Sequence, residues 1–366
     1  MRRHHLPILA VFLGAALSFS PLCAAAQEGT KNVIPYLDEQ PVRAQHGMVV
    51  SVHHLASDAG LEVLRAGGNA VDAAVATGFA LAVVHPAAGN LGGGGFMLLR
   101  THDGHATFID YREKAPLTAT ETMYQDAQGN IIPADSLLSS VIGYRSIATP
   151  GSVAGMVYAE RKYGKLGLAR AMAPAIKLAG DGFVLTSEEA KELSDPDLAK
   201  FPESKRIFQR DGQLYKEGET FRQPELAHTL QRIAADPEEF YRGKMAHELI
   251  EELRKGGALL TLDDLAQYTV VERAPVTGTF HNYSVISAPP PSSGGIVLVS
   301  ALNILEGFDL AKLGDRSPEA LHLIPRPIAA RTWIAPTISA IRTTTTFPLR
   351  LSPPSLTPTR GARRSI

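Results

Sequence analysis

The acidic residues of this sequence stop abruptly before its C-terminal end. Between Pro325 and Ile366 there is no Asp or Glu, while Pro, Thr, Arg and Ser dominate and Thr343–Thr346 form a run. Proline lacks a backbone N–H, and such runs carry no hydrophobic period, so this stretch cannot sustain a buried helix or sheet. We expect residues 325–366 to be an aberrant, disordered low-complexity tail. A native basic extension would account for it, but its composition favours a change of reading frame near Ile324.

The first 26 residues resemble a secretory signal peptide. Basic and histidine side chains at Arg2–His5 precede an apolar run, Leu6–Leu22, and Ala24–Ala26 offers the small residues that a signal peptidase accepts. Two prolines and a glycine interrupt the apolar run, which makes it poor material for a membrane-spanning helix. We therefore expect residues 1–26 to be removed, no membrane anchor, and a periplasmic or secreted mature chain.

Cys23 is the only cysteine in the sequence. Leu22 stands where a lipoprotein signal needs a small residue, so we do not expect a lipid anchor. Once the signal peptide is removed, the mature chain contains no cysteine. Neither a disulfide framework nor a thiol nucleophile is then available.

The composition of the chain is that of an ordinary globular protein. Hydrophobic residues make up 45% and charged residues 20%, which excludes general disorder. The formal net charge of -1 offers no global basic field for nucleic acid or an anionic membrane. Small molecules or protein subunits remain as the expected partners.

Two helices are predicted near the start of the mature chain. The first covers about 56–66 and ends at Gly67-Gly68, because glycine readily adopts the conformation that terminates helices. Asn69 can cap the second helix, with Asp72 at its third position, where a carboxylate favours the exposed amides. Apolar residues then recur at helical spacing, which predicts burial on most sides: Val71, Val75, Phe79 and Ala82.

A β-hairpin is predicted after this helical pair. Its strands cover 96–99 and 106–111 around an Asp103-Gly104 turn. From 150 to about 305 the pattern is mainly helical. Further short strands are predicted at 47–52, 269–272, 277–280 and 283–287. This mixture of elements indicates an α/β (α+β) fold.

The glycine-rich loop Gly89–Gly95 invites comparison with phosphate-binding loops. It lacks a following Gly-Lys-Ser/Thr and the spaced glycines of dinucleotide folds, and a strand follows it instead of a helix. Close packing of backbone against backbone is the better interpretation. We expect no cofactor here.

The paired histidines His53/His54 and His102/His105 are the remaining candidates for metal ligands. No His-Glu-x-x-His spacing occurs, and the second pair brackets a predicted turn. We expect solvated or hydrogen-bonded histidines and no metal site. A Gly-x-Ser-x-Gly nucleophile elbow is also absent from the sequence.

Arg112 is the strongest candidate for ligand binding. It follows the predicted strand 106–111, and residues at strand ends often reach into pockets. A guanidinium can grip a carboxylate with two parallel hydrogen bonds. The alternative is an internal ion pair with Asp110 or Glu113, and the chemistry of the residues alone favours that alternative.

Seven stretches together resemble γ-glutamyltranspeptidases, in family order between Gly47 and Ile324. Each is weak alone, but their combination is specific. They are Gly67–Ala74, Gly92–Met97, Arg112–Pro116, Thr149–Gly155, Pro174–Ala179, Gly257–Leu265 and Pro289–Gly295.

The resemblance implies a fold, a reaction and a role for Arg112. Residues 27–324 would be the heavy-subunit portion of an N-terminal-nucleophile hydrolase, a partial αββα sandwich without its light-subunit half. A proenzyme of this family cuts itself, and the freed threonine transfers the γ-glutamyl group of glutathione to water or an amino acid. Arg112 would hold the donor's α-carboxylate, which reverses the preference for an internal ion pair.

The sequence departs from the family where the chemistry would occur. The light subunit of the family begins with Thr-Thr-His, then Phe or Tyr, then Ser, and no such motif is present. Thr345-Thr346-Phe347-Pro348 lacks the histidine, so we assign no catalytic residue. We expect a truncated, inactive chain whose light-subunit partner is not encoded within it. Without the strands of that half, the fragment should be unstable or aggregate.

Two other functions stay open. The chain could be a noncatalytic subunit that binds γ-glutamyl compounds or a separately encoded light subunit. Without the resemblance, a periplasmic solute-binding protein would fit the export signal and the composition. Within the family, a relative that acts on glutaryl-cephalosporins is also possible.

Overall fold

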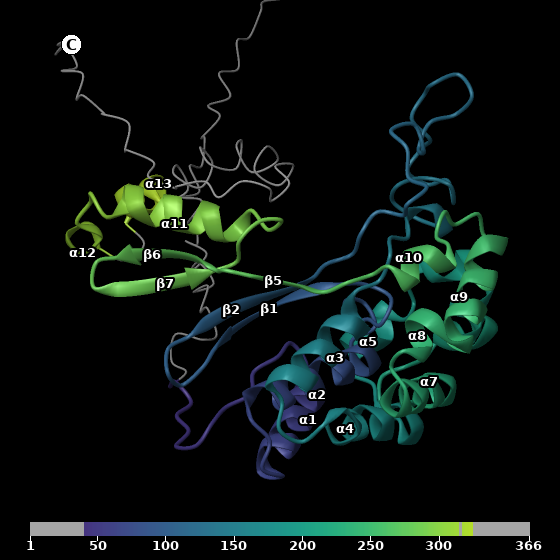
Figure 1. Ribbon diagram of the computed structural model, residues 1–366, viewed down its shortest axis with the longest axis horizontal. Helices are drawn as coiled ribbons and strands as arrows, with labels where there is room; N and C mark the ends of the chain where they lie inside the picture. The colour runs from purple at the N-terminus through teal and green to yellow at the C-terminus, as the bar shows by residue number, and fades with distance from the viewer. Residues whose placement is uncertain (1–39, 315–316, 325–366) are drawn as a thin grey trace, which may run out of the picture. The chain divides into compact units, whose positions relative to one another are not determined.

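The computed structural model describes residues 40–314 and 317–324 (Figure 1). The predicted signal peptide, 1–26, and the predicted tail, 325–366, lie outside these described residues. The chain divides into two compact units, 1–47 and 48–366, and every described helix and strand belongs to the second.

A three-stranded antiparallel sheet lies next to the site described below. Its strand order is β1 (Gly95–Arg100), β2 (Ala106–Tyr111), β5 (Val271–Arg273). The β1–β2 register runs from Gly95 opposite Tyr111 to Arg100 opposite Ala106. The predicted hairpin is therefore confirmed, with its first strand longer by one residue at each end.

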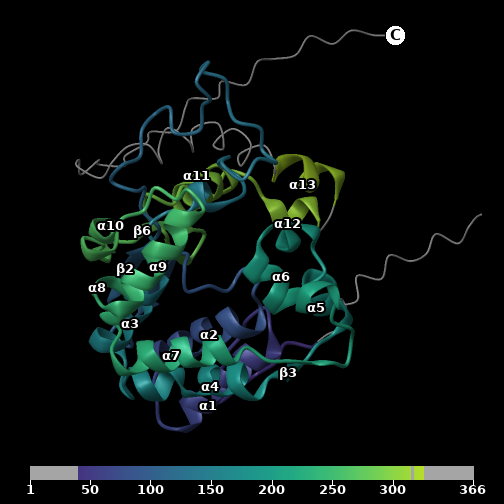
Figure 2. The same ribbon diagram turned by 90° about the vertical axis from the view of Figure 1, so that its right-hand side faces the viewer.

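A layer of helices packs beside this sheet. It consists of α1 (His54–Arg65), α2 (Ala70–Val84), α3 (Ser152–Tyr163), α4 (Leu168–Asp181) and α7 (Pro224–Ala235). α3 contacts both β1 and β2, and α2 contacts α1, α3 and α4. Figure 2 shows α1, α2, α4 and α7 side by side.

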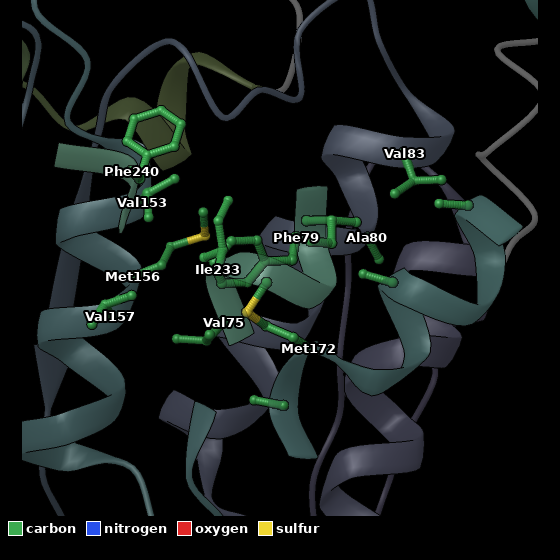
Figure 3. Packing of buried hydrophobic residues seen from close by; sticks show 14 of the residues in the cluster. Val75, Phe79, Ala80, Val83, Val153, Met156, Val157, Met172, Ile233 and Phe240 are labelled. Atoms are coloured by element: carbon green, nitrogen blue, oxygen red, sulfur yellow. The ribbon is translucent and has the colours of Figure 1, made fainter. Parts of the chain in front are cut away.

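The core is centred on α2. As its all-round apolar sequence predicts, Val71, Val75 and Phe79 are all buried. Figure 3 shows Met172 of α4 and Ile233 of α7 gathered close to Phe79. Burying a side chain as large as phenylalanine contributes roughly 1.5–3 kcal/mol, so Phe79 helps to hold α2 against α4 and α7.

The start of α2 is fixed by a capping box. Asn69 accepts the N–H groups of Val71 and Asp72, and Asp72 accepts the N–H of Asn69 at 2.7 Å. Asp72 also accepts the N–H groups of Lys165 and Leu166, at 2.9 and 2.6 Å. One carboxylate therefore joins the start of α2 to the α3–α4 connection.

The remaining elements extend from this centre. β6 (Val276–Phe280) and β7 (Tyr283–Ser287) form an antiparallel hairpin that packs against α11 (Gly294–Leu305). β3 (Phe183–Val184) pairs with β4 (Thr220–Phe221). The helices are α5 (Ser187–Glu192), α6 (Pro202–Gln209), α8 (Glu239–Arg242), α9 (Lys244–Lys255), α10 (Leu262–Ala266), α11 (Gly294–Leu305), α12 (Leu310–Leu313) and α13 (Pro318–Leu323). The strands are β3 (Phe183–Val184), β4 (Thr220–Phe221), β6 (Val276–Phe280) and β7 (Tyr283–Ser287), and the 3-10 turns are η1 (Tyr144–Ser146), η2 (Pro196–Lys200) and η3 (Arg210–Gly212).

The predicted strand at 47–52 is wrong, because the structure has no strand there. Val50 and Val52 are 81% and 77% exposed, and no described strand pairs with this segment. An apolar run becomes a strand only where a neighbour satisfies its backbone hydrogen bonds. The mixed α+β class itself is confirmed. Among the described residues, no helix combines the length and hydropathy that crossing a bilayer requires.

Candidate functional site

Arg112 directly follows β2, and its side chain is exposed. The guanidinium carbon lies 5.9 Å from the centre of the Phe96 ring. The internal ion pair that residue chemistry alone favoured is not formed: within the described part of the chain, no carboxylate pairs with Arg112. The carboxylate of Asp110 pairs instead with Arg273, with Oδ2 and Nε 2.8 Å apart.

The backbone of Arg112 is held on both sides. Its N–H donates to Oδ1 of Asp110 at 3.1 Å, and its carbonyl oxygen accepts the hydroxyl of Tyr268 at 2.9 Å. Asp110 and Tyr268 are 7% and 6% exposed, so water competes weakly for both bonds. Burial raises the pKa of Tyr268, which keeps its hydroxyl protonated and able to donate.

Lys114 links the segment after β2 to two distant parts of the chain by hydrogen bonds. Its backbone exchanges hydrogen bonds with Thr149, at 3.2 and 2.8 Å. Its Nζ donates to the carbonyl of Thr269 at 3.0 Å and lies 4.9 Å from the centre of the Tyr268 ring. The segment after β2 is consequently fixed, although its side chains at Arg112 and Glu113 face solvent.

The glycine-rich loop packs against this segment, as predicted. A Cβ atom on Gly94 would lie 2.6 Å from the backbone nitrogen of Glu113, and one on Gly95 would lie 2.8 Å from the Tyr111 ring. The carbonyl of Gly93 accepts N–H groups at the start of α3, from Gly151 and Ser152. Absence of side chains lets the loop approach this closely, so the prediction of close packing is confirmed.

The two histidine pairs lie in different surroundings. Nδ1 of His53 accepts the N–H of Leu55 at the start of α1, and its Nε2 pairs with Glu189. His102 and His105 are exposed at the β1–β2 turn. Across the described ranges, no group of three or more potential metal-binding side chains occurs.

Three cavities open elsewhere on the second unit, with volumes of about 430, 500 and 500 Å³. Arg112 lines none of these three. Tyr268 lines the first cavity together with Tyr158 and Tyr241. The exposed side chain of Arg112 thus lies outside all three.

Sequence reasoning missed the residues that hold Arg112. Tyr268 lies 156 positions along the chain from Arg112, and Arg273 lies 163 positions from Asp110. No periodic pattern links residues across such a distance. The available signal was Asp110, the one charged residue on the predicted strand 106–111.

Comparisons with known proteins agree on one family. The family model described as gamma-glutamyltranspeptidase matches residues 56–326. The glutathione hydrolase proenzyme of Escherichia coli is 46% identical over 321 residues, which cover 86% of this chain and 55% of that protein. The corresponding proenzyme of Pseudomonas sp. is 47% identical over 288 residues, or 78% of this chain and 49% of that protein. The chain thus spans about half the length of these relatives.

Solved structures of the same family also resemble this chain. The γ-glutamyltranspeptidase of Helicobacter pylori aligns with a TM-score of 0.76 and 38% identity, covering 88% of this chain and 100% of that chain. The enzyme of Pseudomonas nitroreducens, complexed with L-DON, aligns with a TM-score of 0.73 and 38% identity, covering 81% and 87%. The fold is that of N-terminal-nucleophile hydrolases, and the matched region is the large-subunit portion. The chain belongs to the γ-glutamyltranspeptidase family.

Proposed function

We propose that this chain is the donor-binding part of an exported enzyme that transfers γ-glutamyl groups from glutathione or γ-glutamyl amides to water or amino acids. The observation that carries the proposal is the guanidinium of Arg112, exposed and without a carboxylate partner among the described residues. A γ-glutamyl donor has a free α-carboxylate, three carbons from the carbonyl that reacts. The planar guanidinium matches that carboxylate with two parallel hydrogen bonds.

The nucleophile in this proposal comes from a light subunit. The hydroxyl of its N-terminal threonine attacks the γ-carbonyl carbon while its α-amine takes the proton. The amide C–N bond breaks, the amine leaves with a proton, and water or an amino acid then releases the acyl group from the ester. Arg112 contributes by fixing the donor's far end, which orients the carbonyl toward the hydroxyl. The exposure of Arg112 fits a site that a second subunit completes.

A second candidate substrate is a glutaryl amide of the cephalosporin type. An acylase proenzyme of Pseudomonas sp. is 38% identical over 292 residues, and a cephalosporin acylase structure from Bacillus halodurans aligns at 27% identity with a TM-score of 0.67. A glutaryl group carries its carboxylate at the same distance from the reacting carbonyl and lacks only the amino group. Arg112 therefore suits both acyl groups, and their relative kcat/KM must decide between them.

Reconstitution tests whether this chain binds the donor while a light subunit supplies the nucleophile. The purified chain is assayed with γ-glutamyl-p-nitroanilide, alone and after co-expression with the light subunit of a family relative. We expect no turnover above background from the chain alone and restored turnover from the pair. Turnover by the chain alone would refute the assignment of the nucleophile to a partner. Glutathione binding without turnover in any pairing would favour a noncatalytic subunit.

A further inference from the structure

We infer that Tyr268 and Asp110 are positioning residues that orient Arg112 toward a ligand carboxylate. The inference rests on the proposed function, because it assumes that Arg112 holds the donor. It goes further by assigning specific roles to two residues that do not touch the donor themselves. Both act on the backbone of Arg112, and neither occupies its guanidinium.

The two hydrogen bonds fix the main chain immediately before and after the Cα of Arg112. Oδ1 of Asp110 accepts its N–H at 3.1 Å, and the Tyr268 hydroxyl donates to its carbonyl at 2.9 Å. An arginine side chain has several rotatable bonds, and ordering them costs free energy. The Cα of Arg112 is fixed, and its guanidinium lies over the Phe96 ring. Fewer side-chain conformations of Arg112 are therefore lost when a ligand binds.

Asp110 is itself held in place. Its second oxygen, Oδ2, accepts Nε of Arg273 at 2.8 Å, so the carboxylate bridges β5 and the segment after β2. The strand register places Asp110 opposite Val271, two residues from Arg273. The side chain therefore reaches diagonally across the strand pair to Arg273. A carboxylate bound through both oxygens cannot rotate away from the N–H of Arg112 without breaking the ion pair.

The Tyr268 hydroxyl occupies space that a missing side chain leaves open. A Cβ atom on Gly151 would lie 2.1 Å from this hydroxyl oxygen and 2.0 Å from the carbonyl oxygen of Tyr111. Lys114 covers the ring face with its ammonium group, 4.9 Å from the ring centre. The ring is thus confined by two segments, and its hydroxyl is aimed at one backbone acceptor.

The test compares two ligands that differ only at the group Arg112 should recognise. Glutathione and its analogue with an α-carboxamide are titrated into the full chain, with ligand-observed NMR to measure millimolar affinities. We expect the wild type to prefer glutathione by about tenfold or more, the value of a charge-assisted pair of hydrogen bonds. Tyr268→Phe removes only the hydroxyl, and we expect it to reduce this preference to about threefold or less.

Tyr241→Phe is the matched control. Tyr241 is also a buried tyrosine whose hydroxyl donates to a backbone carbonyl, that of Pro150 at 3.1 Å. We expect this variant to keep the wild-type preference, because Pro150 does not carry the guanidinium. A general loss of stability would lower both affinities together in either variant and leave their ratio unchanged.

Asp110→Asn supplies an independent measurement should Tyr268→Phe fail to fold. Its amide oxygen can still accept the Arg112 N–H, but the charge that holds Arg273 is lost, so we expect the preference for glutathione to fall. If the wild type and Arg112→Lys discriminate alike, the proposed function fails. If Arg112→Lys loses the preference while Tyr268→Phe and Asp110→Asn keep it, the proposed function stands and the positioning role is refuted.

Discussion

The carboxyl group of Glu160 in α3 lies beside the carboxylate of Asp72 in α2, and the two side chains are 3% and 0% exposed. Burial alone would raise the pKa of Asp72, but the N–H groups of Asn69, Leu166 and Lys165 lower it overall. Neither oxygen of Glu160 has a hydrogen-bond partner of standard geometry among the described residues. Burial, and then its neighbour Asp72, raise the pKa of Glu160 to about 7. Below about pH 7 the folded chain therefore favours a protonated Glu160.

Replacing Glu160 should change how stability depends on pH. The folded pKa lies above the ordinary value of 4.5, so the folded state binds this proton more tightly than the unfolded state. The resulting stability is complete below about pH 4.5 and is lost as pH rises through about 7. We expect Glu160→Gln, which cannot ionise, to be more stable than the wild type at pH 8 by up to about 3 kcal/mol. Urea unfolding midpoints at pH 5, 6, 7 and 8 measure this difference.

Glu217→Gln provides the control for this experiment, because Glu217 is exposed. It should follow the wild-type curve at every pH. An equal gain for Glu160→Gln at pH 5 and pH 8 would contradict the proposed titration, because it would show that the benefit does not depend on ionisation.

Asp72 should matter more for stability than the residue that caps its helix. Asp72→Ala leaves three backbone N–H groups without their acceptor, those of Asn69, Lys165 and Leu166. These hydrogen bonds are partly buried. A fully buried donor left unsatisfied costs about 1–3 kcal/mol, so we expect a total loss of about 3 kcal/mol from the three together. Asn69→Ala removes a cap, which costs about 1 kcal/mol, and one hydrogen bond to the carbonyl of Tyr163. Chemical denaturation compares the two, and equal losses would show that Asp72 acts only as part of the cap.

The local features of the fold were predictable from neighbouring residues. Asn69 and Asp72 lie three positions apart and form the capping box that their types predict. The β1–β2 hairpin likewise follows from two short strand-like runs on either side of Asp103-Gly104. Both features depend on interactions within one turn of helix or one hairpin, which sequence spacing determines directly.

The contacts around Arg112 were not predictable in this way. Residue chemistry favoured a local ion pair with Asp110 or Glu113, and this was wrong because Arg273 takes the carboxylate of Asp110. The strand predicted at 47–52 fails for a related reason, since strand formation depends on a partner elsewhere. Residue chemistry made Arg112 a candidate for ligand binding, but only the family resemblance favoured that role over an ion pair. Its backbone partners became visible only in three dimensions.

Two glycines in neighbouring helices should respond in opposite ways to alanine. A Cβ atom on Gly155 in α3 would lie 2.0 Å from Cγ of Tyr111, so Gly155→Ala must displace this ring or the helix. We expect a loss of about 1–3 kcal/mol, as in other overpacked cores. Gly180 in α4 is exposed, and its Cβ would lie 3.8 Å from that of Ala227, an ordinary contact. Gly180→Ala should therefore gain up to about 1 kcal/mol from helix propensity. Thermal unfolding measures both, and a neutral Gly155→Ala would refute the close packing of α3 on Tyr111.

Arg112→Lys tests the carboxylate contact in the assembled enzyme. Lysine keeps the positive charge but loses the planar fork, so the donor should bind more weakly in the ground state and in the transition state. We expect the KM for a γ-glutamyl donor to rise about tenfold or more, with a smaller change in kcat, because Arg112 does not contact the reacting carbonyl in this proposal. Arg100→Lys, at the exposed end of β1, is the matched control and should leave both constants unchanged. An unchanged KM in Arg112→Lys would show that the guanidinium does not hold the donor, even though it is free of carboxylate partners among the described residues.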